Sequence, residues 1–600
     1  MYEHINTDIY FFKGGIMFNK ERVSNYDKYP FTYVSDEKKG VWEGYDEIIN
    51  ELNNQQFSNK KVIVFDYYHG VDEKEIYEKL IKKLDFDYIF DFSLVKKEEE
   101  EVLKFLSRNL TDDRVFGVLS NYINITELLQ IDKLEKIKRE ISQIKSGKIL
   151  VYGIGASLIP HDKLVYFDLT RWEIQQRFRD NSLDNWNAKN FTEDVLKKYK
   201  RAFFIEWRIL DNHKKRLLKN IDYYLDTNIK ENPKMITGEN LLKGFEKTVA
   251  KPFRLVPFFD PGVWGGQWMK KICDLDREKK NFAWCFDCVP EENSINLKFN
   301  NVVVQVPAIN LVFNNPKELL GDKVHAKFGT EFPIRFDFLD TFDGQNLSLQ
   351  VHPLTEYIQE KFGMHYTQDE SYYILDAKEN AVVYLGVKEN INPQEMIDAL
   401  DRAQTGQEIF DDTKYVNQFE AKKHDHFLIP AGTVHCSGRD TMVLEISSTP
   451  YIFTFKLWDW NRLGLDGLPR PIHLEHGKYN IQFDRDTKWV KENLVNNISV
   501  IKDENGVLEE KTGLHEREFI ETRRYWSLDK IVLNNEKNLS VLNLVEGEEA
   551  IVKSPENKFE PFVVHYAETF IVPAQIGEYT ISPYGKSIGE KIGVIRAYVR

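Results

Sequence analysis

Short apolar runs alternate with longer charged stretches over the first third of the chain. Six apolar runs have the length of a buried strand: 61–65, 88–90, 114–119, 148–152, 164–167 and 201–205. Three stretches between them have a helical pattern: 72–84, 131–144 and 170–178. Strands that alternate with helices are typical of an α/β domain with a mostly parallel sheet. The pattern therefore predicts such a domain over residues 1–235.

The pattern changes near residue 235, where Pro, Gly and aromatic residues become more frequent and long helical periodicity becomes scarce. From 332 to 456, and again from 525 to the end, short β-branched and aromatic runs are separated by turn residues, which predicts antiparallel jelly-roll strands. The residues between these regions, 474–493, are more polar and helical. We expect four parts: an α/β domain (1–235), a β module (240–465), a partly helical segment (466–520) and a second β module (521–600).

Composition narrows the class of protein. The 600 residues are 42% hydrophobic and 29% charged, as in globular proteins of more than one domain. The net charge of −14 disfavours nucleic acid or an anionic membrane as the main partner. Four cysteines are too few for a disulfide framework, and neither a signal peptide pattern nor a membrane-spanning apolar run is visible. We expect a cytoplasmic protein, and the sequence leaves its oligomeric state open.

Four side chains of the β region are suitable metal ligands. Gln350 and His352 are two positions apart in an alternating run, so on a strand they project from the same face. Glu370 begins a second apolar run, and His435 follows a Pro-Ala-Gly turn. Imidazole, carboxylate and amide groups suit Zn²⁺ or another borderline divalent ion. A Gln-x-His pair is usually just a pair of polar residues on a solvated strand face, so the spacing alone favours that interpretation.

The motifs of the last 350 residues form a series. In chain order they are 261–266, 338–340, 347–353, 370–377, 384–386, 429–435, 444–445, 571–575 and 577–580. This series resembles class I mannose-6-phosphate isomerases, also called phosphomannose isomerases, of the cupin superfamily. The first motif is similar to the family's entry motif, and the last two resemble its closing β module. The resemblance covers about residues 250–600.

The resemblance implies a fold, an activity and a cofactor. The fold is the cupin type, a double-stranded β-helix or jelly roll. One Zn²⁺ per chain is held by the matching Gln350, His352, Glu370 and His435. The activity is the interconversion of mannose 6-phosphate and fructose 6-phosphate, through a cis-enediol formed by moving a proton between C1 and C2. The partner is then a small-molecule sugar phosphate.

The sequence departs from the family at two cationic positions. Gln368 stands where the family often has a Lys, two positions before the metal-binding Glu. Lys456 stands where an active-site Arg is expected, which keeps the charge but not the planar guanidinium. Arg462 matches a second basic position, and it suits substrate binding and an ordinary surface position equally well. Glu445 is either a proton carrier or, slightly favoured, a carboxylate that holds its neighbours. Lys456, Glu445 and Arg462 are the catalytic candidates.

The amino-terminal half carries weaker signals. A glycine pair in 151–157 follows an apolar strand, but the third glycine of a dinucleotide fingerprint is absent and no P-loop sequence is present. The half resembles nucleoside-kinase-like α/β domains only loosely, at the level of the fold. Four charged residues suit either a pocket at strand ends or structural salt bridges and caps, with the structural role favoured: Asp66, Asp168, Arg171 and Arg208.

Two functions remain open from the sequence. The first is a zinc-dependent aldose-ketose isomerase of a phosphorylated hexose, fused to an α/β domain of unknown function. The alternative is a sugar-binding regulatory protein that keeps the metal site with little or no turnover, or an isomerase of a different sugar, including an unphosphorylated one. The changes at Gln368 and Lys456 keep this alternative open.

Overall fold

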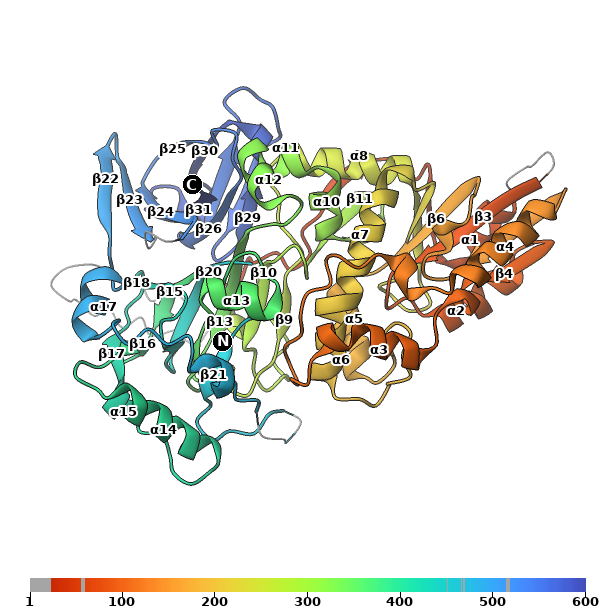
Figure 1. Ribbon diagram of the computed structural model, residues 1–600. Helices are drawn as coiled ribbons and strands as arrows, with labels where there is room; N and C mark the ends of the chain where they lie inside the picture. Colours follow the sequence, from red (N-terminus) through yellow and green to blue (C-terminus); the bar gives the residue numbers. More distant parts are fainter. Residues whose placement is uncertain (1–22, 55–59, 450–451, 466, 468–469, 514–517) are drawn as a thin grey trace, which may run out of the picture.

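The computed structural model describes residues 23–600, apart from 55–59, 450–451, 466, 468–469 and 514–517. The sheets of this described part form an α/β sheet at one end of the molecule and two pairs of antiparallel sheets at the other (Figure 1). In the same residues, no helix is both long and apolar enough to cross a membrane.

The α/β sheet has the strand order β2-β8-β7-β6-β3-β5-β4. Its strands are β2 (Val41–Glu43), β3 (Lys60–Tyr67), β4 (Tyr88–Asp91), β5 (Gly147–Tyr152), β6 (Lys163–Asp168), β7 (Tyr223–Asp226) and β8 (Lys234–Thr237). Strands β3 to β7 are parallel, and β2 and β8 complete one edge antiparallel. Residues 62–67 of β3 are all buried, as expected for a central strand covered on both faces. The mostly parallel sheet predicted from the sequence is present.

Helices connect these strands. They are α1 (Gly44–Asn53), α2 (Glu73–Lys79), α3 (Glu99–Leu110), α4 (Ile131–Gln143), α5 (Arg171–Arg179), α6 (Val195–Arg201) and α7 (Trp207–Leu217). Three of them begin at side-chain caps, because Asp72 accepts the backbone N–H of Glu75, Thr170 that of Glu173 and Asp194 that of Leu196. The three helical stretches predicted from the sequence coincide with α2, α4 and α5.

Two of the predicted strands are wrong. The run 114–119 is a loop without strand structure, and its apolar character comes from Phe116 and Leu119, which are buried. The run 201–205 lies in a continuous helical segment in which a π-helical turn (Ala202–Glu206) joins α6 to α7. Its side chains are buried all round, and a short apolar run in a buried helix has the same pattern as a buried strand.

The metal-ligand candidates lie in a pair of antiparallel sheets. One has the order β18-β15-β20-β13-β10-β9 and the other β17-β16-β19-β14-β21. Their strands are β9 (Phe258–Asp260), β10 (Trp284–Cys288), β13 (Ile334–Asp340), β14 (Leu349–Val351), β15 (Glu370–Ala377), β16 (Val382–Val387), β17 (Val416–Glu420), β18 (His426–Ile429), β19 (His435–Ser437), β20 (Thr441–Ser448) and β21 (Phe455–Trp458). Every residue of β13 and β20 is buried, so this pair encloses a core.

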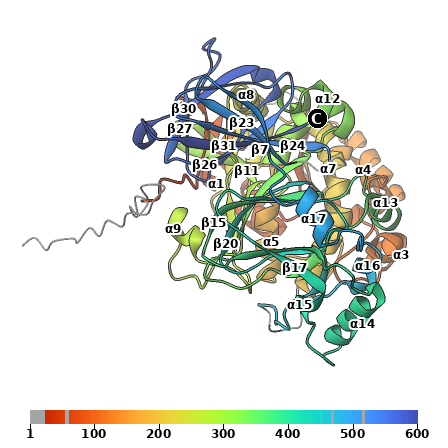
Figure 2. The same ribbon diagram turned by 90° about the vertical axis from the view of Figure 1, so that its left-hand side faces the viewer.

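The carboxy-terminal pair of sheets lies above the pair that carries the metal-ligand candidates (Figure 2). Its strands are β22 (Ser499–Glu504), β23 (Val507–Gly513), β24 (Ile520–Ser527), β25 (Ile531–Asn534), β26 (Ser540–Glu546), β27 (Glu549–Lys553), β28 (Phe562–His565), β29 (Thr569–Val572), β30 (Glu578–Pro583) and β31 (Ile592–Val599). The pair has a separate core that includes Leu542, Phe570 and Tyr579. The short helices α16 (Leu474–Gly477) and α17 (Thr487–Asn493) precede it.

Other helices surround the sheets. They are α8 (Gly238–Val249), α9 (Trp268–Ile272), α10 (Ala308–Asn314), α11 (Pro316–Leu320), α12 (Asp322–Phe328), α13 (Thr355–Phe362), α14 (Pro393–Gln404) and α15 (Asp412–Tyr415). A small sheet joins the start of the described chain to its middle, since β1 (Thr32–Ser35) pairs with β11 (Ser294–Phe299), which pairs with β12 (Val302–Pro307). The division of the chain into four parts stays a prediction.

The loop at 111–120 connects the α/β domain to the metal-bearing sheets. The ring of Phe116 lies 5.6 Å from that of Phe362 and 5.2 Å from that of Phe455, measured between centroids. The backbone N–H of Leu119 donates to the carbonyl of Phe362 at 2.9 Å. Buried apolar side chains of both parts form one continuous core. The two parts therefore support each other.

Candidate metal centre

The four predicted ligands come together between two sheets. Gln350 lies on β14, His352 directly follows that strand, and His435 opens β19 of the same sheet. Glu370 opens β15 of the facing sheet. All four side chains are buried. Because the facing sheets exclude water from the space between them, charges placed there interact strongly.

The ligand atoms lie close to one another. The Nε2 atom of His352 is 3.1 Å from one carboxylate oxygen of Glu370, and the Nε2 atom of His435 is 2.8 Å from the other. The amide nitrogen of Gln350 is 3.2 Å from Nε2 of His435. An amide presents its oxygen to the same point when it turns over, so Gln350 is placed to be a fourth ligand.

The orientation of both imidazoles fits a metal ion. The Nδ1 atom of His352 is 3.0 Å from the carbonyl oxygen of Phe453, and that of His435 is 2.8 Å from the carbonyl oxygen of Thr433. A carbonyl only accepts hydrogen bonds, so each Nδ1 carries a proton, and Nε2 is the ring nitrogen that faces Glu370 and that a metal ion would bind. The group of His352, Glu370 and His435 therefore has the geometry to hold a metal ion.

A second layer of polar side chains surrounds Glu370. The amide nitrogen of Gln368 donates to Glu370 at 3.0 Å and reaches Glu445 at 3.4 Å. Glu445 also accepts hydrogen bonds from Arg335 and, at 3.0 Å, from Ser447. Burial raises the pKa of Glu445 well above its ordinary value, although the guanidinium of Arg335 opposes this. An amide thus bridges two carboxylates at the position where a lysine was expected.

Arg335 is a site residue that the sequence analysis missed. It lies on β13 and pairs with both Asp337, at 3.0 Å, and Glu445. Glu445 is 110 positions further along the chain, so no local motif contains the pair. The available signal was a cation in a strand that alternates charged and apolar side chains, with Asp337 two positions away as a partner on the same face, since a buried cation is costly unless it is paired.

Lys456 lies opposite Gln350. The two residues are partners in the antiparallel pair of β14 and β21, so their side chains project from the same face. Burial and the neighbouring cations Arg470 and Arg462 lower the pKa of Lys456 to about 7. Arg462 and Arg470 both form ion pairs with Asp459. Arg462 is therefore held in place beside Lys456, and it is largely buried, unlike an ordinary surface arginine.

The charged candidates of the α/β half have structural roles. Asp66 accepts the backbone N–H groups of Gly155, at 2.9 Å, and Ser157, at 3.0 Å. The backbone N–H of Gly155, in the glycine pair, therefore donates to a carboxylate of the protein and is not available to a phosphate. Asp168 forms an ion pair with Lys214 at 3.1 Å. Arg171 forms an ion pair with Asp211, and Arg208 donates a hydrogen bond to the carbonyl of Phe203.

Comparisons with known proteins divide the chain in two. Residues 44–250 match a family model described as a domain of unknown function, DUF8485. A mannose-6-phosphate isomerase from Streptococcus mutans is 27% identical over 231 residues, which are 38% of this chain and 66% of that protein. The protein YvyI of Bacillus subtilis, provisionally named as such an isomerase, is 23% identical over 338 residues, 55% of this chain and 95% of that protein.

Two solved structures match a similar share of the chain. The crystal structure of mannose 6-phosphate isomerase from Bacillus subtilis matches 58% of this chain and all of that chain, with 19% identity and a TM-score of 0.47. A mutant of phosphomannose isomerase from Salmonella typhimurium matches 58% of this chain with 14% identity and a TM-score of 0.44. The curated relatives, 23 to 27% identical over 38 to 55% of the chain, confirm its resemblance to the mannose-6-phosphate isomerases.

Proposed function

We propose that the chain is a metal-dependent aldose-ketose isomerase that interconverts mannose 6-phosphate and fructose 6-phosphate. The observation that carries the proposal is the buried group of His352, Glu370 and His435 with Gln350 beside it. These ligands lie between two antiparallel sheets, as in a cupin-type fold. We take the proposed substrate from the names of the curated relatives, which are mannose-6-phosphate isomerases.

Zinc is the metal that the ligands suit best. Two neutral imidazoles and one carboxylate form a common set of ligands for catalytic zinc, and the amide oxygen of Gln350 can complete it. When bound, the ion supplies positive charge that stabilises negative charge developing on the sugar oxygens. The carboxylate of Glu370 neutralises part of the positive charge of the ion. The hydrogen bond from Gln368 holds Glu370 in place.

Lys456 is the side chain that we assign to the substrate. Isomerisation moves a proton between C1 and C2, and the substrate also carries a phosphate. The site therefore needs one group that assists the proton transfer and another that binds the phosphate. Glu445 and Arg462 are already bound to protein partners. Among the described residues, the amine of Lys456 makes no hydrogen bond or ion pair. It is therefore available to a sugar oxygen or to the phosphate, with Arg462 adding positive charge.

Metal analysis of ligand variants tests the proposal. We expect about one zinc per chain in the wild type and none in His352→Ala or His435→Ala, because each substitution removes one of two imidazole ligands. His365→Ala is the matched control, since His365 is an exposed imidazole outside the site. Equal metal content in the wild type and both ligand variants would refute the metal centre.

A sugar-binding protein without turnover is the second candidate. It is favoured by the replacement of two expected cations by Gln368 and Lys456. It predicts that mannose 6-phosphate binds the zinc-loaded chain in calorimetry, while a coupled assay detects no fructose 6-phosphate. The same assay on unphosphorylated mannose distinguishes an isomerase of a neutral sugar.

A further inference from the structure

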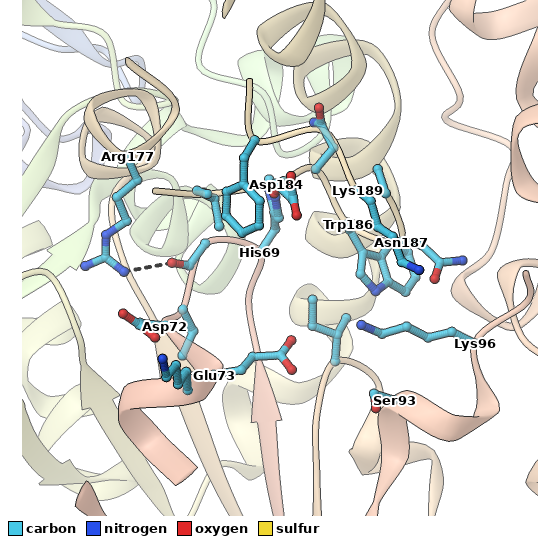
Figure 3. Close-up of a pocket in the computed structure, with 18 of the residues that line it drawn as sticks. His69, Asp72, Glu73, Ser93, Lys96, Arg177, Asp184, Trp186, Asn187 and Lys189 are labelled. Carbon is cyan, nitrogen blue, oxygen red and sulfur yellow. Dashed lines mark hydrogen bonds between the residues drawn. The ribbon is translucent and has the colours of Figure 1, made fainter. Parts of the chain in front are cut away.

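The α/β domain contains a cavity of about 850 Å³ that shares no residue with the metal centre. The segments that follow the carboxyl ends of β3, β4 and β5 contribute to its walls, together with α5 and residues 182–191 (Figure 3). Its volume lies within the range of small-molecule sites. Nothing in the proposed isomerase reaction uses this cavity.

The position of the cavity follows from the strand order. Strands β3 and β6 are neighbours, but β3 connects through α2 toward β4 on one side, while β6 connects toward β7 on the other. Ligands of open α/β sheets bind at such a switch point, beyond the carboxyl ends of the strands. His69 and Gly70, which follow β3, and Arg177 on α5 line the cavity at this point.

The inner wall of the cavity contains buried side chains, one of which is held by hydrogen bonds at both ring nitrogens. His69 is fixed at both ring nitrogens, since Nδ1 accepts from the indole of Trp207 at 3.3 Å and Nε2 lies 3.0 Å from the carbonyl oxygen of Asp184. Trp186, only 4% exposed, also lines the cavity, and its indole N–H has no hydrogen-bond partner among the described residues. Buried donors are almost always paired with protein or ordered water, so this donor beside the cavity needs an acceptor that either water or a ligand can supply.

Charges of both signs line the cavity. Figure 3 shows Asp72, Glu73 and Arg177 on one side, and Lys96 and Lys189 on the other side with Trp186. Arg177 is already held by Glu173 and by the carbonyls of Gly70 and Thr227. Within the described part of the chain, the amines of both lysines and the carboxylate of Glu73 have no protein partner. An anion alone would be repelled by the carboxylates, and a cation alone by the lysines. The lining therefore suits a ligand with an anionic end and a hydrogen-bond-donating end.

We propose that this cavity binds a phosphorylated sugar. The phosphate lies between Lys96 and Lys189, because charge-assisted hydrogen bonds are the strongest that these side chains offer. The sugar hydroxyls donate to Asp72 and Glu73, and a ring or phosphate oxygen accepts from Trp186. Lysines hold the phosphate in place of a glycine loop, since Asp66 already occupies the amide of Gly155. The site does not depend on the metal centre or on its activity.

Calorimetry on the full chain tests this site with two probes, ribose 5-phosphate and glucose 6-phosphate, and with ribose, glucose and inorganic phosphate for comparison. We expect at least one sugar phosphate to bind more tightly than either of its halves. The double variant Lys96→Ala, Lys189→Ala should weaken that binding about tenfold or more. Lys104→Ala, an exposed lysine on α3 outside the cavity, is the control and should bind like the wild type. Glu73→Gln should weaken the sugar phosphate but not inorganic phosphate.

Hydrogen exchange locates the probe. Binding in the cavity should slow exchange in residues 69–75 and 182–191, and the double lysine variant should lose this protection. The variant lysines have no protein partners, so folding should be unaffected, as a thermal melt checks. The proposal is overturned if neither sugar phosphate binds, if the double variant binds like Lys104→Ala, or if protection appears only around the metal centre. An amino acid that binds here in place of the sugar phosphates would also overturn it.

Discussion

Replacing Phe116 by alanine should weaken both the fold and the metal centre. Phe116 lies on the loop of the α/β domain that enters the metal-bearing sheets, and its side chain is 1% exposed. Its ring is 4.8 Å from that of His473 and stacks on that of Phe453 at 6.1 Å. The carbonyl of Phe453 in turn accepts the Nδ1 proton of His352. The loop is thus one residue away from a metal ligand.

The expected size of the effect follows from this burial. A buried Phe replaced by Ala typically costs 3 to 5 kcal/mol, so we expect about 3 kcal/mol or more for Phe116→Ala. Groups that orient a ligating histidine typically change metal affinity by 10- to 100-fold, and Phe116 acts through one further contact. We therefore expect zinc to bind about tenfold more weakly in this variant.

Guanidinium denaturation and a zinc titration against a chelating dye measure the two effects. Phe105→Ala is the matched control, because Phe105 belongs to the same domain but is 42% exposed on α3. It should change stability by about 0.5 kcal/mol or less and leave zinc affinity unchanged. If Phe116→Ala denatures and binds zinc like Phe105→Ala, the α/β domain does not support the metal centre and this reasoning is refuted.

Two further substitutions test separate parts of the structure. Lys456→Arg should lower the KM for mannose 6-phosphate about tenfold in steady-state kinetics, because it places a permanent planar cation opposite Gln350; a raised KM would contradict the assignment of Lys456 to the substrate. Burial raises the pKa of Glu291 from its ordinary 4.5 to about 7, so the stability that this carboxyl group contributes at acid pH is lost as the pH rises through 7. Glu291→Gln should therefore stabilise the chain by up to about 3 kcal/mol at pH 8, at about 1.4 kcal/mol per pKa unit, and hardly at pH 4; an equal shift in melting temperature at both pH values would contradict this.

Local patterns were sufficient wherever one segment determines its own structure. The alternation around Gln350 and His352 placed both side chains on one face of a strand, and the apolar runs at 148–152 and 164–167 correspond to β5 and β6. The run 114–119 failed because its apolar residues are buried by segments more than 200 positions away. A local pattern shows that a residue is buried but not by which partner.

The same limit applies to the sites. Gln350 and His352 share one motif, and Glu370 and His435 each lie in another, so the family resemblance could indicate the candidate ligands before the strands were assembled. Arg335 acquires its role only when β13 and β20 pair and bring Glu445 beside it. The cavity of the α/β domain is made by polar loops that follow different strands. Each loop taken alone has the pattern of an ordinary solvated connection, so no local motif predicted that these loops would meet around a cavity.

A coupled assay of the purified full chain on mannose 6-phosphate, before and after removal of metal by a chelator, tests the isomerase proposal as a whole. We expect fructose 6-phosphate to form in the untreated protein, its formation to stop after chelation, and about stoichiometric Zn²⁺ to restore it. If the zinc-loaded chain forms no fructose 6-phosphate, or if chelation leaves the rate unchanged, the chain is not a metal-dependent mannose-6-phosphate isomerase.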